Sequence, residues 1–146
     1  MNPQPYSNLS DLELCSLCVW REARGEGLLG KRGVAHVVKN RSDNPSWWGH
    51  SVSTVILERY QFSSFNPGDP NADQWPADND PAYSDSLTVS EDVLVNGDSD
   101  ITQGATSYFD ISIPTPIWAG SMTLTLAVGR LRFYKLKEEN PNESIT

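Results

Sequence analysis

The chain has 146 residues, of which 38% are hydrophobic and 21% charged, and its net charge is −8 at neutral pH. This length and composition predict one globular domain, residues 1–146, rather than a disordered chain. The negative charge excludes a phosphate backbone as a natural partner, and no apolar stretch approaches the ~20 residues of a membrane-spanning helix, so neither nucleic-acid binding nor membrane insertion is expected.

The N-terminal segment is informative about secretion and about the redox state of the cysteines. The first cationic side chain is Arg21, and residues 1–14 contain no apolar h-region, so we expect no secretory signal peptide. Cys15 and Cys18 are the only cysteines in the sequence, and they stand three positions apart inside a predicted helix. An unstrained disulfide cannot close there, and both are interpreted as reduced, buried side chains.

Two helices are predicted in the first third of the chain. The first begins at a capping box, in which Ser10 is followed three positions later by Glu13, and it repeats apolar residues at helical spacing. The second falls within residues 27–45, where valines recur on one face until a Ser/Asp/Asn/Pro cluster ends the pattern. These elements indicate a helical N-terminal part.

Two further helices are predicted on either side of a long polar loop. A short one lies within residues 51–62, and a longer one has Asp80 as N-cap, Pro81 at its first position and Gly97 just past its end. The loop over residues 63–80 contains three prolines and many acids, and a loop of this length is usually functional or disordered. We expect it to form the rim of a groove.

After residue 100 the sequence is rich in Thr, Tyr, Phe, Ile and Val with partial alternation, which favours strands within residues 105–113 and 121–136. Helices followed by short strands indicate an α+β domain, mainly helical in its N-terminal two-thirds and with short strands in its C-terminal third. The polar residues 137–146 are expected to form a flexible tail.

Four charged residues gather where the first helix should end, namely Arg21, Glu22, Arg24 and Glu26. One interpretation is that Gly25 ends the helix and that all four side chains are solvated. The other is that the last helical turn carries Glu22 into a buried place, where lost hydration raises its pKa and favours the protonated form that a general acid needs. This second interpretation requires Arg21 and Arg24 to point away from Glu22.

The segment from Asp69 to Asp80 partly matches a calcium-binding loop, because Asn71 and Asp73 continue an alternate spacing of oxygen ligands. Gln74 replaces the glycine that such a loop requires, so a solvated acidic loop is the preferred interpretation, and ion binding there stays open. Zinc binding would require both cysteines to leave a core-facing helix. We therefore expect no metal site and no cofactor.

Several aromatic residues are candidates for a saccharide-binding groove, because aromatic rings pack on the apolar faces of sugars. Most aromatic side chains simply belong to the core, and this holds for each candidate taken alone. Trp75 and Trp118 are expected to be more exposed than the others. The candidates are Trp47, Trp48, Trp75, Tyr108 and Trp118.

Six sequence blocks follow one another in a recognisable order: REARGEG, GKRGVAHVVKNR, QFS, GATSYFD, PTPIW and AVGRLRFYK. With these blocks the chain resembles the spore-cortex-lytic type of cell-wall hydrolase over about residues 14–135. The resemblance implies a lysozyme-like catalytic domain. It also implies cleavage of the β-1,4 bond between N-acetylmuramic acid and N-acetylglucosamine in bacterial peptidoglycan.

The resemblance also implies roles for individual residues. Glu22, the first glutamate of the EARGE block, is implied to be the catalytic acid. Groove or support roles are implied for other positions on the family's blocks, and these are Glu26, Gln61, Tyr108, Trp118 and Tyr134. The chain departs from the family pattern where Arg130 and Leu131 replace Asn and His, and where Tyr108 replaces a common His, which bears on substrate contacts rather than on Glu22.

Two reaction outcomes and one non-enzymatic role are left open. In lytic transglycosylases, which this family resembles, the sugar's own C6 hydroxyl attacks C1, so Glu22 alone would protonate the leaving oxygen and later accept a proton. A hydrolytic muramidase would use water and a second carboxylate, Glu26 or Asp110. A non-catalytic peptidoglycan-binding or virion structural protein that kept the fold is the alternative from another class.

The small size of the chain resembles that of a phage endolysin or a virion-associated lysin. The partner implied is bacterial peptidoglycan, with a holin-type release protein or virion components beside it. The location implied is the host cytoplasm before release to the cell wall, or the virion itself.

Overall fold

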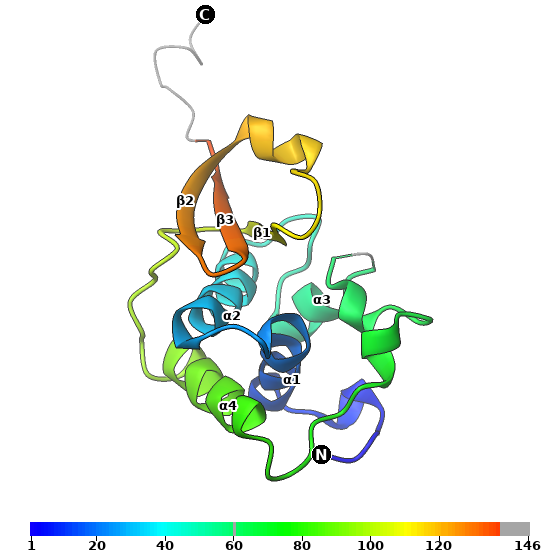
Figure 1. Cartoon of the computed structure of the whole chain (residues 1–146). Helices are drawn as coiled ribbons and strands as arrows, with labels where there is room; N and C mark the ends of the chain where they lie inside the picture. Colours follow the sequence, from blue (N-terminus) through cyan, green and yellow to red (C-terminus); the bar gives the residue numbers. More distant parts are fainter. Residues whose placement is uncertain (60, 138–146) are drawn as a thin grey trace, which may run out of the picture.

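The structure is a computed structural model that describes residues 1–59 and 61–137. Helices form one part of the molecule, and a small antiparallel sheet lies against one end of them (Figure 1). This arrangement confirms the predicted α+β fold class. The main elements are α1 (Asp11–Ala23), α2 (Leu28–Asp43), α3 (Val52–Leu57), α4 (Pro81–Leu94), β1 (Ser107–Asp110), β2 (Met122–Val128) and β3 (Leu131–Leu136).

Helix α1 is the central helix, and local sequence sets its start. Ser10 Oγ accepts a hydrogen bond from the Glu13 amide, and Glu13 Oε1 accepts one from the Ser10 amide, both at 3.1 Å. This confirms the predicted capping box, which satisfies two donors that a helix start otherwise leaves unpaired. The helix ends at Ala23, so Glu22 lies on its last turn.

Helices α2 and α4 pack against α1, and the core between them consists of buried apolar side chains such as Leu17, Val37 and Val89. The predicted start of α4 is confirmed, because Asp80 Oδ1 accepts from the Ala82 amide at 2.9 Å and Pro81 takes the first helical position. Cys15 and Cys18 are buried free thiols, as predicted.

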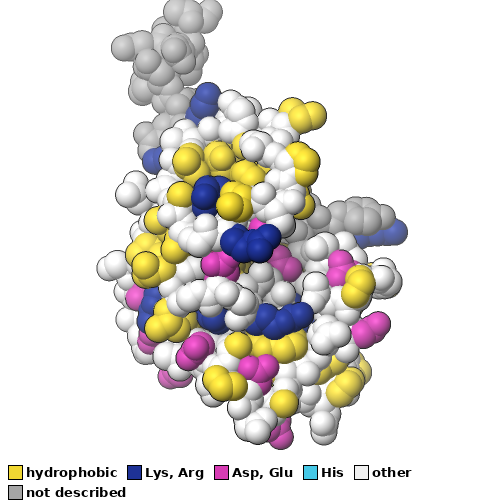
Figure 2. All heavy atoms as spheres, in the orientation of Figure 1, with side chains coloured by type: hydrophobic (Ala, Val, Ile, Leu, Met, Phe, Trp, Pro, Cys, Tyr) yellow, Lys and Arg dark blue, Asp and Glu magenta, His cyan; other side chains and the backbone are white. Residues whose placement is uncertain are grey.

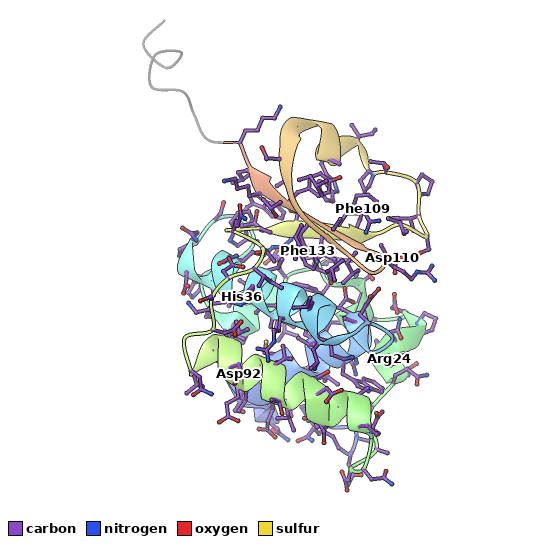
Figure 3. The ribbon with its side chains drawn as sticks, turned by 60° about the vertical axis from the view of Figure 1, so that its left-hand side comes forward. Arg24, His36, Asp92, Phe109, Asp110 and Phe133 are labelled. Atoms are coloured by element: carbon purple, nitrogen blue, oxygen red, sulfur yellow. The ribbon has the colours of Figure 1, made fainter. Side chains whose placement is uncertain are left out.

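The sheet is joined to the helices at a close contact between α2 and β3. A side chain at Gly33 would overlap the ring of Phe133, which is fully buried. Only glycine therefore lets the phenylalanine reach the backbone of α2. Figure 3 shows Phe133 at this junction, between the sheet and the helical layer. The strand order is β1-β3-β2, so β3 is the central strand.

A second connection fixes the turn between β2 and β3. Gly129 has a φ of +53°, and glycine at the first position of a two-residue loop is typical of tight hairpins. Glu26 Oε1 accepts a hydrogen bond from the Arg130 amide at 3.1 Å, which ties the α1–α2 connection to this hairpin. The sheet is thus held over the end of α1 that carries Glu22.

The loop over residues 63–80 wraps around the buried guanidinium of Arg21. That group donates hydrogen bonds to the carbonyl oxygens of Ser64, Ala72 and Gln74 at 3.1 to 3.2 Å. Only Ser63 of this loop lines the large pocket described below. The prediction that the whole loop forms a groove rim is therefore wrong, because an arginine on α1 organises most of it. Residues 138–146 of the predicted flexible tail lie outside the described residues.

Candidate active site

A pocket of about 610 Å³ opens where the sheet meets the ends of α1 and α2. Its lining combines apolar and aromatic side chains with a few polar groups, which is typical of sites that bind small molecules. The lining includes Glu22, Arg41, Trp118, Met122, and the segments 47–48, 61–63 and 106–110. On the face of the molecule in Figure 2, hydrophobic side chains gather over the sheet, and charged side chains lie between the sheet and the helices.

Glu22 is half-buried and lines this pocket. Tyr108 donates a hydrogen bond from its hydroxyl to Glu22 Oε1 at 2.5 Å, whereas Oε2 has no hydrogen-bond partner among residues 1–59 and 61–137. The same part of the chain forms no ion pair with Glu22. One carboxyl oxygen is therefore held in place and the other is left for a ligand.

The two arginines beside Glu22 in sequence point away from it. Arg21 is enclosed by the 63–80 loop, and Arg24 lies over the ring of Trp20 and donates to Asn71 Oδ1 at 3.1 Å. The orientation that a proton-donating Glu22 requires is thus present. The interpretation in which all four charges of this cluster are solvated is wrong, because Arg21 is buried and Glu22 half-buried.

Tyr108 is half-buried, and it lines the pocket while packing against the core. Its ring packs near those of Phe62 and Phe133, at centroid distances of 6.5 and 5.5 Å. Burial raises the pKa of Tyr108 well above its ordinary value, and the nearby Glu22 carboxyl raises it further. Tyr108 therefore remains a protonated hydrogen-bond donor at neutral pH.

A buried arginine also lies near Tyr108. Arg41, at the end of α2, donates from Nε to the carbonyl oxygen of Thr106 at 2.7 Å and from Nη1 to Gln61 Oε1 at 3.5 Å. Its guanidinium lies 5.3 Å from the ring centre of Phe62. Burial lowers the pKa of Arg41 below its ordinary value, but an arginine stays charged under such a shift.

Asp110, at the end of β1, is the other carboxyl that lines the pocket. Its Oδ1 accepts from the Ser112 amide at 2.8 Å and from Arg130 Nε at 3.3 Å. The Ser112 amide is the main cause that holds the pKa of Asp110 below its ordinary value. Figure 3 shows Asp110 next to Phe109 on the strand. Asp110 is therefore an ionised carboxylate, unsuited to donate a proton.

The structure brings four of the six predicted site residues together. Glu22, Gln61, Tyr108 and Trp118 line the pocket, and the remaining two do not. Glu26 instead accepts from the hairpin amide of Arg130. Tyr134 packs against Trp118, with ring centres 5.4 Å apart, and so supports the pocket wall from behind.

The aromatic candidates divide between the pocket and other places. Trp47 and Trp48 line the pocket, with 67% and 6% of their surfaces exposed. Trp75 lies elsewhere, stacked on Tyr6 beside Arg21. The expectation that Trp75 and Trp118 are the most exposed tryptophans is therefore wrong, because Trp47 is more exposed than either. Trp75 belongs to the packing around a buried cation.

Two acidic residues of the proposed calcium loop serve as helix caps. Asp69 Oδ1 accepts from the Asn71 amide at 2.8 Å, and Asp80 caps α4 while its Oδ2 accepts from Trp20 Nε1 at 3.0 Å. In the described ranges, His, Cys, Asp and Glu side chains form no group of three or more that could hold a metal ion. Within those same ranges, no helix has the length and apolar character needed to cross a bilayer.

Sequence reasoning missed Arg41 and Thr106 as residues of the pocket. A signal for Arg41 was present, because it continues the helical spacing of Val34, Val37 and Val38 and so places a cation on the buried face of α2. Thr106 carries no such signal, since it precedes β1 in a segment where threonine is simply a common strand residue.

Known proteins resemble the chain in sequence and in structure. It is 32% identical to the spore cortex-lytic enzymes of Halalkalibacterium halodurans, over 130 residues, and Oceanobacillus iheyensis, over 133 residues. These alignments cover 88% and 91% of this chain but only 35% and 44% of the relatives, so the chain spans less than half of their length.

Two solved structures share the fold at 28% sequence identity and a TM-score of 0.69, and both are catalytic domains of SleB, from Bacillus cereus and from Bacillus anthracis. The superpositions cover 91% and 92% of this chain and 94% and 100% of those domains, and the second protein is described as a germination-specific lytic transglycosylase. Residues 25–134 also match the sequence profile of the cell wall hydrolases. The chain therefore belongs to the cell wall hydrolase family.

Proposed function

We propose that this chain cleaves the β-1,4 glycosidic bond between N-acetylmuramic acid and N-acetylglucosamine in peptidoglycan, with Glu22 as the general acid. The observation that carries the proposal is the position of Glu22, half-buried in an aromatic pocket with one oxygen held by Tyr108 and the other unpartnered in the described chain. Membership of the cell wall hydrolase family supports the substrate class.

Proton transfer to the leaving oxygen is the first step that this arrangement supports. Protonated Glu22 donates its proton to the glycosidic oxygen as the bond to C1 breaks, and it becomes a carboxylate. The hydroxyl of Tyr108 then stabilises the new charge through the hydrogen bond to Oε1. The apolar walls from Phe62, Trp48 and Trp118 exclude water and so strengthen this interaction.

We further propose that the acceptor is the C6 hydroxyl of the muramic acid ring, as in a lytic transglycosylase. Its oxygen bonds to C1 while its proton passes to the Glu22 carboxylate, so Glu22 is restored and the product is a 1,6-anhydro sugar. One carboxyl suffices for this cycle. The description of the related Bacillus anthracis domain as a lytic transglycosylase supports the same outcome.

A hydrolytic muramidase is the second candidate, and the presence of Asp110 in the pocket favours it. Asp110 is ionised and would activate a water molecule or stabilise positive charge at C1. Glu26, the other carboxyl considered, is engaged with the hairpin outside the pocket lining, which makes it the weaker partner.

The test is digestion of purified peptidoglycan by the wild type and by Glu22→Gln, with product masses determined. We expect Glu22→Gln to lose at least ~10²-fold in rate, because an amide cannot donate the required proton. Glu91→Gln is the matched control, since Glu91 is exposed on α4 and lies outside the pocket. Full activity of a folded Glu22→Gln variant would refute the assignment.

Product mass distinguishes the two acceptors. Attack by the C6 hydroxyl leaves a muramic acid end lighter by one water than the hydrolytic product, whereas incorporation of labelled oxygen from solvent would identify hydrolysis. Binding of the wild type to insoluble peptidoglycan without release of fragments would instead support the non-catalytic alternative. A phage origin, a holin-type release partner and a location in the host cytoplasm or the virion stay predictions.

A further inference from the structure

The pocket contains a positive charge that has no acidic partner in the described part of the chain. Arg41 lines the pocket and is only 7% exposed, yet no carboxylate of residues 1–59 and 61–137 lies within 4.0 Å of its guanidinium. Burying an unpaired charge is costly, and buried cations are normally paired. The missing partner of Arg41 is thus a question that the proposed reaction has not answered.

The hydrogen bonds of Arg41 leave part of the guanidinium free. Nε is used by the Thr106 carbonyl oxygen and Nη1 reaches Gln61 Oε1 at 3.5 Å, whereas Nη2 has no partner among the described residues. The fully buried side-chain atoms that lack a partner in that part of the chain do not include Nη2. Since Nη2 has no partner, it must be open to solvent. Since Arg41 lines the pocket, a ligand in the pocket has access to this donor.

Two neighbouring groups have unused hydrogen-bonding capacity as well. The side-chain Oε1 of Gln61 faces Arg41, and its side-chain Nε2 has no partner in the described residues. The hydroxyl of Thr106 is a buried oxygen without any partner in the same residues, and Thr106 is only 6% exposed while lining the pocket. A buried polar atom without a partner, such as the Thr106 hydroxyl, is uncommon in folded proteins and calls for an explanation.

The other charges of the pocket are arranged so that an anion at Arg41 is tolerated. Asp110 is paired with Arg130 at 3.3 Å, and Glu22 accepts from Tyr108. In the proposed reaction Glu22 enters the cycle protonated, so it adds no repulsion at that stage. With Glu22 protonated, Arg41 is thus the charged pocket residue of the described chain that has no opposite charge beside it.

We propose that Arg41, with Gln61 and Thr106 beside it, binds a carboxylate carried by the sugar at the cleavage site. This inference rests on the proposed function and names its substrate more closely. Muramic acid carries a lactyl carboxyl group, whereas glucosamine carries none. A guanidinium binds a carboxylate through charge-assisted hydrogen bonds, and a carboxylate offers enough lone pairs for Gln61 and Thr106 too.

The proposal has a consequence for the form of the substrate. The lactyl carboxyl is a free anion only where no stem peptide is attached, because the peptide occupies it as a neutral amide. The chain is therefore directed to glycan strands from which the peptide has been removed. The reaction that supplies such strands is the hydrolysis of the amide bond between the lactyl group and the peptide.

The experiment compares two tetrasaccharides of alternating N-acetylglucosamine and N-acetylmuramic acid. One has free lactyl carboxylates, and in the other each carboxyl is converted to an N-methylamide. The wild type should cleave the free acid about tenfold more efficiently in kcat/KM, the size of one charge-assisted hydrogen bond. Arg41→Met should reduce this ratio to about one, because it keeps an unbranched side chain and removes the charged guanidinium.

Controls separate binding from folding. Arg24→Met removes an exposed arginine outside the pocket and should leave the tenfold ratio intact. Arg41→Lys retains a charge without the planar guanidinium, and we expect it to show an intermediate ratio. It serves as the test variant if Arg41→Met fails to fold. Binding of both tetrasaccharides to Glu22→Gln, measured by calorimetry, should show the same preference without any turnover.

The outcomes distinguish this inference from the proposed function. Equal cleavage of both tetrasaccharides by the wild type, or an unchanged ratio in folded Arg41→Met, would overturn the carboxylate site and leave the glycosidase proposal intact. If the wild type cleaves neither compound, the glycosidase proposal is overturned. In that case a preference of Glu22→Gln for the free acid would still support the site, and equal binding would refute it.

Discussion

At the scale of single residues, the candidate site depends on how one carboxyl is held. Glu22 is placed by the last turn of α1, but its orientation depends on Tyr108, which comes from β1 and is separated from it by more than half of the chain. Tyr108 is half-buried and its pKa is raised, mainly by lost hydration, so its hydroxyl acts as the donor at neutral pH. Tyr108 is therefore a positioning residue for Glu22.

Replacement of Tyr108 by Phe tests this role. We expect kcat on peptidoglycan to fall about tenfold to a hundredfold in Tyr108→Phe with little change in KM, because the lost hydrogen bond stabilises the carboxylate formed in the reaction. The ring contacts to Phe62 and Phe133 remain, so the melting temperature should change little. Tyr134→Phe, outside the pocket lining, is the control, and an equal loss in both variants would contradict the role.

At the scale of elements, the pocket exists because the sheet is held at a fixed place over the helices. Two contacts do this: the packing of Phe133 on α2 at Gly33, and the hydrogen bond from the Arg130 amide to Glu26. The first is buried and apolar, whereas the second is polar and lies at the hairpin. Tyr108 and Phe133 face each other across β1 and β3, so a shift of the sheet would move the donor to Glu22.

Gly33→Ala tests the junction between α2 and the sheet. The added methyl group would overlap the Phe133 ring, so we expect a loss of about 1 to 3 kcal/mol in the free energy of unfolding, although alanine is the better helix former. Gly25→Ala is the matched control, since no atom lies within 4 Å of a Cβ there. Denaturant unfolding of both variants measures the difference, and equal stabilities would show that the junction adjusts without cost.

At the scale of the whole molecule, the core contains ionisable groups that are folded in their neutral forms. Cys15 and Cys18 are fully buried and Tyr108 is half-buried, and loss of hydration is the largest cause of the raised pKa of each. For Cys15 the pKa rises from 9.0 to about 11. The stability that each neutral group contributes is fully present below its pKa in the unfolded chain. It is lost as the pH rises through the higher pKa of the folded chain.

Alkaline destabilisation is the expected result. Between about pH 9 and pH 11 the unfolded chain releases the Cys15 proton and the folded chain keeps it, so the unfolded state binds fewer protons and stability falls with pH. The rise from 9.0 to about 11 corresponds to about 3 kcal/mol for this thiol. Urea unfolding from pH 7 to pH 11 measures the slope, and Cys15→Ala should make it shallower. The same slope in both proteins would contradict this account.

Elements of the fold that depend on short-range interactions could be predicted from the sequence, and those that depend on distant residues could not. The capping box at Ser10, the Asp80-Pro81 start of α4 and the strand-rich C-terminal third all depend on neighbours within a few residues, and each was confirmed. The 63–80 loop was not understood, because its conformation depends on Arg21. An arginine at a helix end gives no local sign that several distant carbonyl groups will surround it.

By itself the sequence determined the helices and strands, the family, and Glu22 as the candidate acid, because local hydrogen bonds, periodicity and short motifs are written in adjacent residues. Only the tertiary structure decided that Tyr108 holds Glu22, that Glu26 serves the hairpin, and that Arg41 stands in the pocket without an acidic partner in the described chain. The physical reason is that burial and charge pairing depend on which distant segments pack together, and no local pattern specifies those contacts.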